Sequence, residues 1–265
     1  ALSNAAKKAA LETSFDSSQT AEGLKLLAAN GFSAEESISS LIPTLNFATA
    51  SMGKIGVCGA VNIAGDVVDA FGMSANEIPK ILDQLSTATR VGTIEFGELE
   101  SIISTTAVNA SNFGQTLPTT ITMIGAMKKA GIDAATASST LSNSFRQLST
   151  NEEAVSQLKK MGISVTDSGG KFRDFTDILG DVIDKSGSLG DLEASNLSMT
   201  LFGMKGRKMF NAVQGQTFET MVNGEKVMLK GVDAIRAMRN EISDATVSTK
   251  SLADELRKTL PGAMD

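Results

Sequence analysis

Residues 31–45 read Gly-Phe-Ser-Ala-Glu-Glu-Ser-Ile-Ser-Ser-Leu-Ile-Pro-Thr-Leu, and this stretch decides the fold. Ser33 and Glu36 have the spacing of a capping box, in which the serine accepts from a first-turn N–H and the glutamate reaches back. Apolar side chains then recur at i, i+3, i+4 and i+7, which predicts an amphipathic helix with one buried face. These side chains are Ile38, Leu41, Ile42 and Leu45.

The same pattern returns further along the chain. Ser74 and Glu77 form a second box, and the apolar spacing follows it at residues 78–85. A glycine that ends one helix and a cap that begins the next stand at residues 31–33, 72–74 and 114–116, and again at 131–133. The first three signals are 41 and 42 residues apart, and periods near 40 are typical of stacked helical hairpins.

The sequence therefore predicts a mainly α fold. Region 1–150 is expected to contain amphipathic helical hairpins in loosely repeated units of about 41 residues. One partner helix is expected through Glu95 to Val108, and Pro118 fits the first turn of the next helix. A true solenoid stays open as an alternative, because two good repeats and one poor one do not establish an array.

The pattern of residues changes in region 151–265. Thr150 and Glu153 predict a capped helix, and a short β-hairpin is expected near residues 162–173, around Asp167-Ser168-Gly169-Gly170. A second hairpin is possible at 217–229, because Asn-Gly is the preferred type I′ pair, although this stretch could instead be helical. Further helices are expected at four places, namely 175–183, 191–210, 232–242 and from about 251 to the residue before Pro261.

The composition indicates a folded protein with an unusual set of aromatic residues. Of 265 residues, 42% are hydrophobic, which argues against wholesale disorder, and all aromatic residues are Phe. The net charge of −6 has the wrong sign for a protein that grips nucleic-acid phosphates over a wide surface. The chain begins at Ala1 without an initiator Met or a signal peptide, so we expect a segment of a longer protein or a processed product.

One apolar run has to be weighed as a membrane segment. Residues 55–65 are small or apolar between Lys54 and Asp66, but about 18–20 apolar residues are needed to span a bilayer. The run also contains Asn62, so a buried helix is the better interpretation.

The chain offers little for catalysis. It has no histidine, which removes the commonest general base and zinc ligand. The single cysteine, Cys58, excludes an internal disulfide framework and is expected to be a packed, inert thiol within Gly56–Ala60. Four acidic residues lie in a helix–loop region, match no calcium loop and are expected to be solvated. They are Asp181, Asp184, Asp191 and Glu193.

Binding motifs are equally weak. Gly53, Gly56 and Gly59 are not followed by Lys-Ser or Lys-Thr, so close helix packing explains them at least as well as a phosphate loop does. Lys205, Arg207 and Lys208 form one basic cluster without interleaved aromatic residues, which predicts a surface helix face. We therefore predict no catalytic, cofactor-binding or metal-binding residue, and a protein that contacts other molecules without transforming them.

Several segments, in their order and spacing over roughly residues 20–215, resemble one known family. The segments are 26–36, 48–50, 70–77, 129–133, 158–165 with Gly170 and Phe172, and 201–203 ahead of Gly206. In this respect the chain resembles the central region of phage tail tape measure proteins. The last fifty residues add little to the resemblance.

The resemblance implies a structural, non-enzymatic role. Tape measure proteins are elongated helical chains in the lumen of the tail tube; they set tail length as a scaffold for tube polymerisation and leave before the DNA. The implied partners are the tail tube protein, tail assembly chaperones, tail tip or baseplate hub proteins and further copies of the chain, with possible host membrane contact after ejection. Neither a cofactor nor sequence-specific nucleic-acid binding is implied. The implied location is the virion, and the host cytoplasm during assembly.

Other classes stay open at this point. A membrane-active helical protein, either pore-forming or an ejected channel component, is the main alternative, because the 55–65 run and the helix faces are rich in Gly and Ala. A helical-repeat adaptor would need more regular repeats. An enzyme would have to work with carboxylates alone.

Overall fold

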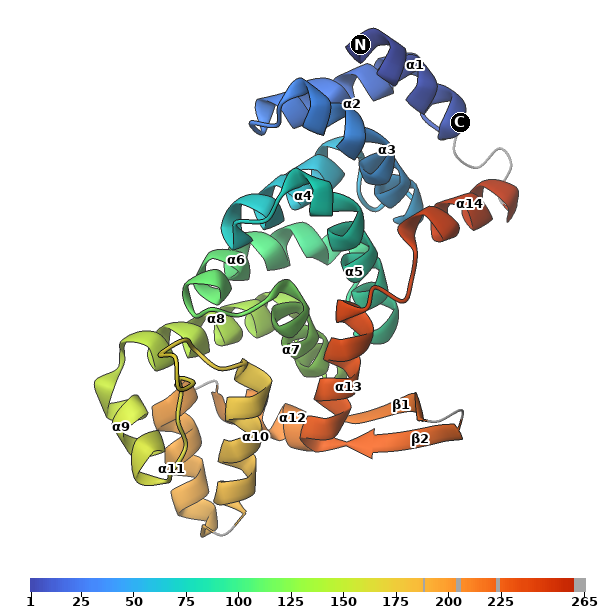
Figure 1. The fold of residues 1–265 in the computed structure, drawn as a ribbon. Helices are drawn as coiled ribbons and strands as arrows, with labels where there is room; N and C mark the ends of the chain where they lie inside the picture. The colour runs from blue at the N-terminus through green and yellow to red at the C-terminus, as the bar shows by residue number, and fades with distance from the viewer. Residues whose placement is uncertain (188, 204–205, 223–224, 260–265) are drawn as a thin grey trace. The chain divides into compact units, whose positions relative to one another are not determined.

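The computed structural model describes residues 1–187, 189–203, 206–222 and 225–259. This part of the chain contains fourteen α-helices, two short 3-10 helices and one two-stranded antiparallel sheet, which confirms the mainly α prediction (Figure 1). The helices are α1 Leu2–Glu12, α2 Ser17–Ala29, α3 Ala34–Ala50, α4 Val57–Phe71, α5 Ile78–Val91, α6 Leu99–Asn112, α7 Leu117–Lys129, α8 Ala134–Thr150, α9 Glu152–Lys160, α10 Phe175–Ser186, α11 Asp191–Phe202, α12 Gly206–Gln214, α13 Gly231–Ser243 and α14 Thr249–Thr259. The 3-10 helices are η1 Ala75–Glu77 and η2 Phe96–Glu98, and the strands are β1 Thr217–Val222 and β2 Glu225–Lys230.

Contacts divide the chain into two compact units. Unit 1 contains residues 1–90, 95–103 and the described residues from 244 onward, so its last helix, α14, comes from the other end of the sequence. Unit 2 contains residues 91–94 and 104–243. The predicted division into regions 1–150 and 151–265 stays a prediction.

The helix starts predicted at Ser33, Ser74 and Thr116 are confirmed. The Ser33 N–H donates to the Glu36 carboxylate at 2.9 Å, and the Ser33 hydroxyl accepts from the Glu36 N–H at 3.3 Å. The second box has the same geometry, with 2.8 Å between the Ser74 N–H and the Glu77 carboxylate. Thr116 caps α7 through the Thr119 N–H. The helix starts were predictable because a capping box is a contact within four consecutive residues.

The predicted helix ends are also confirmed. Gly31, Gly72 and Gly114 have φ angles of 88°, 61° and 64°, the left-handed conformation that glycine adopts without a Cβ penalty. In each case the N–H after the glycine bonds to a carbonyl five residues back, which satisfies one of the orphan carbonyls of the helix end. These turns join α2 to α3, α4 to η1 and α6 to α7.

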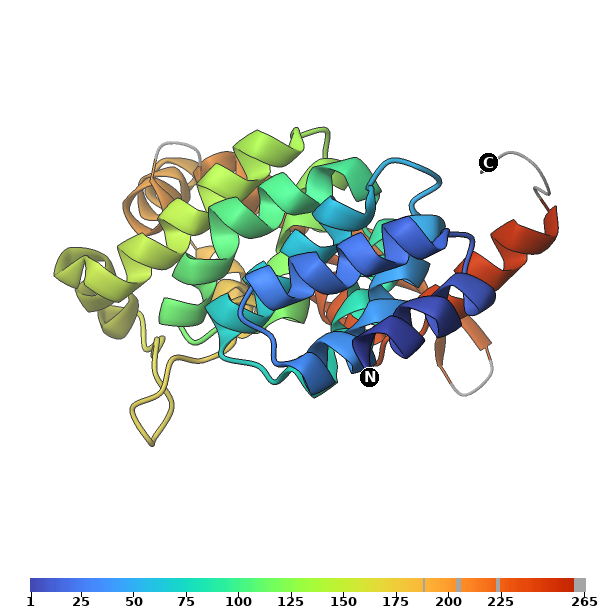
Figure 2. The same cartoon turned by 90° about the horizontal axis from the view of Figure 1, so that it is seen from above.

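The core of unit 1 lies on α3, α4 and α5. Helix α3 contacts α2, α4 and α14, and α1 and α2 lie side by side (Figure 2). The predicted stripe of α5 is fully buried, and on α3 its Leu41 and Leu45 are buried while Ile38 and Ile42 are half-buried. Burial of these apolar side chains, at roughly 25 cal/mol per Å² removed from water, is the main stabilising contribution.

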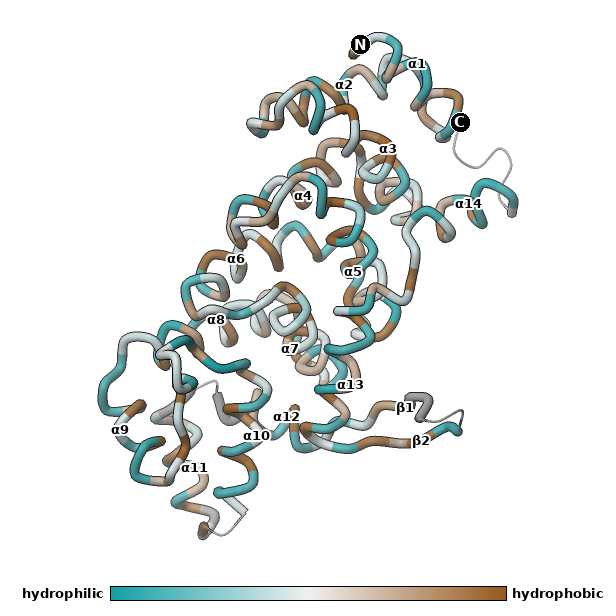
Figure 3. The backbone as a smooth tube through the Cα atoms, in the orientation of Figure 1, coloured by the Kyte–Doolittle hydropathy of each residue, from teal (hydrophilic) through white to brown (hydrophobic). Residues whose placement is uncertain are grey.

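Unit 2 is organised around α7. Every residue from Leu117 to Met127 is buried, including three threonines. Figure 3 shows the hydrophobic residues of the helices as brown stretches that alternate with hydrophilic ones along the tube. Phe113, Phe145, Phe172 and Phe175 form an aromatic cluster, with ring centroids 5.5 Å apart between Phe113 and Phe145 and 5.1 Å apart between Phe145 and Phe175. The sequence patterns did not point to this cluster.

The two predicted hairpins fare differently. The second one forms, with Thr217 opposite Lys230, and its Phe218 packs on Ala234 and Met238 of α13. Its Asn223-Gly224 turn lies outside the described residues. At 162–173 the chain turns back around Asp167–Gly170 as predicted, with one antiparallel bridge between Thr166 and Phe172, but the bridge does not extend into strands. The chain must turn immediately afterwards to begin α10, which leaves no length for a ladder.

Two helix boundaries were also wrongly predicted. Thr150 does not begin a helix; it is the last residue of α8, and the Asn151 side chain caps α9 by accepting from the Glu153 and Ala154 N–H groups. The long helix expected over 191–210 is divided into α11 and α12, with Gly203 between them at a φ of 76°. A left-handed residue cannot continue an α-helix.

The small-residue run at 55–65 begins just before α4 and continues in it. Ala60, Val61, Ile63 and Ala64 face the core, as predicted. Cys58 does not, because the helical period leaves positions 58, 62, 66 and 69 away from the buried face, so the expectation of a packed thiol was wrong. No helix in the described residues is both long enough and apolar enough to cross a bilayer.

Candidate functional site

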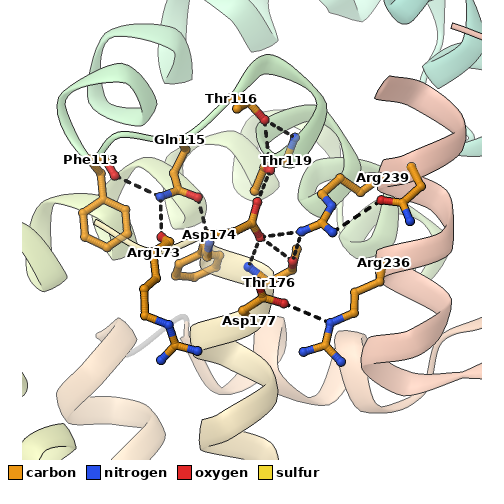
Figure 4. A network of polar contacts seen from close by, with 12 residues as sticks. Phe113, Gln115, Thr116, Thr119, Arg173, Asp174, Thr176, Asp177, Arg236 and Arg239 are labelled. Atoms are coloured by element: carbon orange, nitrogen blue, oxygen red, sulfur yellow. Dashed lines mark hydrogen bonds and ion pairs between the residues drawn. The ribbon is translucent and has the colours of Figure 1, made fainter. Parts of the chain in front are cut away.

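A polar network surrounds the start of α10 in unit 2 (Figure 4). Asp174 is the N-cap of α10, and its Oδ1 accepts from the Thr176 N–H at 2.8 Å and from the Thr176 hydroxyl. Its Oδ2 accepts from the Thr119 hydroxyl of α7 at 2.6 Å. Arg239 of α13 places Nη1 at 2.9 Å from Asp174 Oδ1. We call Thr119, Asp174, Thr176 and Arg239 the Asp174 network.

The surroundings keep Asp174 ionised. Burial alone would raise the pKa of this carboxyl, but hydrogen bonds from Thr119 and Thr176 and the positive charge of Arg239 outweigh it. The pKa therefore lies below its ordinary value. The Asp174 and Arg239 side chains are only 24% and 22% exposed, so solvent screens their attraction less than at an open surface.

Gln115 fixes the backbone that leads into the network. Its amide Nε2 donates to the carbonyls of Phe113 and Arg173, both at 2.9 Å, and its Oε1 accepts from the Phe175 N–H at 2.7 Å. The residue is 4% exposed, so each of these bonds is made away from water. Gln115 thereby ties the residues on both sides of Asp174 to the α6–α7 turn.

Outer ion pairs extend the network toward solvent. Arg236 of α13 lies 3.0 Å from Asp177, and Arg173 lies 2.8 Å from Asp181. The Arg236 and Asp177 side chains are 39% and 40% exposed, so this pair contributes little to stability. Its position on the same two helices as the Asp174–Arg239 pair still favours one alignment of α10 on α13.

This arrangement joins helices and does not prepare a reacting group. A general base needs an accessible lone pair and a pKa near the working pH, whereas Asp174 accepts three hydrogen bonds and has a lowered pKa. The network holds α10 against α7 and α13. Among the described residues, no group of His, Cys, Asp or Glu could hold a metal ion.

The acidic residues singled out from the sequence do not converge. Asp184 and Glu193 are exposed, as expected, and the side chain of Asp191 lies outside the described residues. Asp181 differs from the expectation of a merely solvated charge, because Arg173 pairs with it. Sequence reasoning missed Asp174, although an Asp just before a helical pattern is an N-cap signal.

The glycines and the basic cluster have separate explanations. Close packing applies to Gly59 alone, where a Cβ would lie 2.9 Å from Ile55 Cγ2, while Gly53 and Gly56 have nothing within 4 Å of that position. The packing interpretation was therefore wrong for Gly53 and Gly56. In the basic cluster, Lys208 is exposed on α12, but Lys205 and the side chain of Arg207 lie outside the described residues.

Comparison with known proteins identifies relatives. A family model described as "Phage-related minor tail protein" matches residues 3–203. The protein named "Tape measure protein" of Pneumococcus phage Dp-1 is 23% identical over 250 residues, which cover 94% of this chain and 20% of the relative. The chain thus spans about a fifth of the length of this curated relative. No solved structure matches.

Proposed function

The chain belongs to the phage-related minor tail protein family, and on that premise we propose that it is a segment of a tail tape measure protein. The observation that carries the proposal is the family match over residues 3–203, together with similarity along 94% of the chain to the phage Dp-1 tape measure protein. A structural role in a phage tail, as part of the virion, follows from the family.

The proposed role is to set tail length as a scaffold for tube polymerisation and to leave the tube during DNA ejection. The helical content supports it, because a helix rises about 1.5 Å per residue and so converts chain length into distance. A net charge of −6 also supports passage ahead of DNA, since like charges do not adhere.

The proposed location is the lumen of the tail tube, with assembly in the host cytoplasm. The proposed partners are the tail tube protein, tail assembly chaperones, tail tip or baseplate hub proteins and further copies of this chain, followed by host membrane contact after ejection. We propose neither catalysis, nor a cofactor, nor sequence-specific nucleic-acid binding. The support is the match to a family of structural tail proteins.

The two compact units affect how the segment can set tail length and therefore act as a ruler. Their cores are made by side-chain contacts between helices, which an extended chain does not keep. We propose that the units open before the segment enters the narrow lumen, or that the segment stays outside it. A thermal melt without a cooperative transition would contradict the proposal that the two units fold before they open.

Deletion tests the ruler directly. Residues 33–73 contain α3 and α4, and removing them in frame joins Phe32 to Ser74, so a capping box still follows the Gly31 turn. We expect tails shorter by about 60 Å, the helical rise of the deleted residues, when measured by electron microscopy. Tails of unchanged length with lost infectivity would instead place the segment outside the measured span.

The matched control separates chain length from folding. Leu45→Asp puts a charge into a fully buried position of α3 without changing the number of residues. We expect normal tail length from this variant, because a ruler measures residues and not the stability of unit 1. A tail shortened by the substitution alone would mean that the fold, and not the length, is measured.

The membrane-active alternative gains no support from any helix of the described residues. Dye release from liposomes discriminates between the two functions, since the proposed ruler is expected to leave vesicles intact.

A further inference from the structure

Helix α14 is bound to unit 1 by polar contacts at both of its ends. At its start, the Thr249 hydroxyl lies 2.8 Å from the Ser86 hydroxyl, and the Thr249 N–H donates to Asp83 at 2.7 Å. Just before the helix, the Val247 N–H donates to the Thr87 hydroxyl at 3.0 Å. All of these partners lie on α5, more than 150 positions earlier in the sequence.

The other end of α14 is held through one arginine. Arg257 donates from Nη2 to Asn46 Oδ1 of α3 at 2.6 Å and from Nε to the Ser14 hydroxyl at 3.2 Å. Asp254, one turn earlier, lies 2.7 Å from Arg257 Nη1 and so orients the guanidinium. We call the surface of Asn46, Asp83, Ser86 and Thr87 the α14 seat.

Between its ends, α14 packs along α3. It buries Thr249 and Ala253, half-buries Leu252 and Leu256, and has a basic last turn. Water can replace most of the hydrogen bonds of a detached α14, so each contributes only about 0.5–1.5 kcal/mol. One short connection joins α14 to the preceding helix, so α14 can open as a single element before the rest of unit 1 unfolds.

The connection to α14 is short and strained. Five residues, 244–248, separate α13 from α14, and among them Ala245 has a φ of 51°. A left-handed conformation costs a residue with a Cβ roughly 1–2 kcal/mol. An extended connection removes this cost. Short connections under strain favour the exchange of an element between copies, because the exchanged element makes the same contacts without the strain.

We propose that the α14 seat of one chain binds the α14 of a second copy, so that two chains exchange α14 reciprocally. Every contact of the seat joins segments far apart in sequence, and the second copy presents the same Thr249, Asp254 and Arg257 to it. The exchange provides a surface for the self-association in the proposed function, on which this inference rests. It commits to α14 of an identical chain as the occupant.

Cysteines placed on separate chains test the exchange. In a Cys58→Ser background, one chain carries Ser86→Cys and the other Thr249→Cys, whose native hydroxyls lie 2.8 Å apart. The two purified full-length chains are mixed at about 1 mM, the effective concentration of flexibly tethered partners, and oxidised. The control replaces the second chain by Lys250→Cys, on the neighbouring residue of α14, whose native side chain is 71% exposed.

We expect several-fold more covalent heterodimer from the Ser86→Cys and Thr249→Cys mixture than from the control, because only a seated α14 brings a thiol to buried position 86. A third chain that carries both substitutions must close its own bridge at low concentration, which shows that the seat tolerates cysteines. Heterodimer no more abundant than in the control, while the third chain closes normally, would overturn the exchange. That result would leave the tail-length role untouched, since deletion and electron microscopy test it separately.

Discussion

The carboxylate of Asp174 lies 2.9 Å from the guanidinium of Arg239, and the two residues belong to different helices, α10 and α13. The same carboxylate also accepts from Thr119 of α7, so one side chain joins three helices of unit 2. Because both charges are mostly removed from water, removal of either one leaves the other without its countercharge at a poorly hydrated position.

Asp174→Asn is therefore expected to destabilise unit 2 by about 2–3 kcal/mol, because hydrogen bonds to a charged group are the strong ones. Urea unfolding followed by circular dichroism measures the change. Asp184→Asn is the matched control, since this exposed carboxylate lies on the same helix. A double-mutant cycle with Arg239→Gln should give a coupling energy of about 1–3 kcal/mol. A coupling near zero would contradict the pairing.

The same residue predicts a pH dependence. The pKa of Asp174 is lower in the folded chain than its ordinary value of 3.8, so the folded state binds this proton more weakly than the unfolded state. Its contribution is fully present above the ordinary pKa and is lost as pH falls through the lowered one. Urea midpoints measured from pH 7 down to about pH 2 should fall more steeply for the native chain than for Asp174→Asn. Parallel curves would count against the lowered pKa.

Asp66 on α4 should behave in the opposite way. Burial, followed by the nearby negative charges of Glu100 and Asp69, raises its pKa above the ordinary value of 3.8. Ionisation at neutral pH therefore costs unit 1 stability, and Asp66→Asn should raise the melting temperature at pH 7 but not at pH 3. The gain should be on the order of 0.5 kcal/mol and smaller at high salt, because solvent reaches this group. A lower melting temperature at pH 7 would contradict the repulsion.

Two helical glycines provide a matched pair of substitutions. A Cβ at Gly125 of α7 would lie 2.9 Å from the Gly92 Cα, and that backbone cannot yield easily. Gly125→Ala is expected to cost about 1–3 kcal/mol. At Gly59 of α4 the equivalent contact is the end of the Ile55 side chain, which can rotate. Gly59→Ala should be neutral, or stabilising by up to about 1 kcal/mol through helix propensity. Equal effects in thermal melts would contradict the predicted difference between the two contacts.

The features that the sequence predicts are the local ones. The box of Ser33 and Glu36 and the left-handed Gly31 are contacts among neighbours, so their residues alone define them. The pair of Asp174 and Arg239 is 65 positions apart, and no pattern in one segment indicates its partner in the other. For the candidate site, therefore, the sequence predicts Thr116 as a cap but not the network that Thr119 completes.

The wrong predictions also concern features that the local sequence pattern does not define. The break at Gly203 is hidden in a continuous apolar pattern, because the period of a helix does not show where a single left-handed residue interrupts it. The exposure of Cys58 depends on which face of α4 is covered, and its small apolar neighbours suggested the wrong one.

The contact between α14 and α3 has a consequence for folding during translation. Asn46 and Arg257 are 211 positions apart, and chains grow at about 5–20 residues per second. Asn46 therefore leaves the exit tunnel about 10–40 seconds before the arginine that covers it. During that interval the helices that carry the α14 seat are already synthesised, and the α14 of the same chain is not. The same message carries other nascent chains at that time. Which α14 binds the seat therefore depends on the timing of translation as well as on affinity.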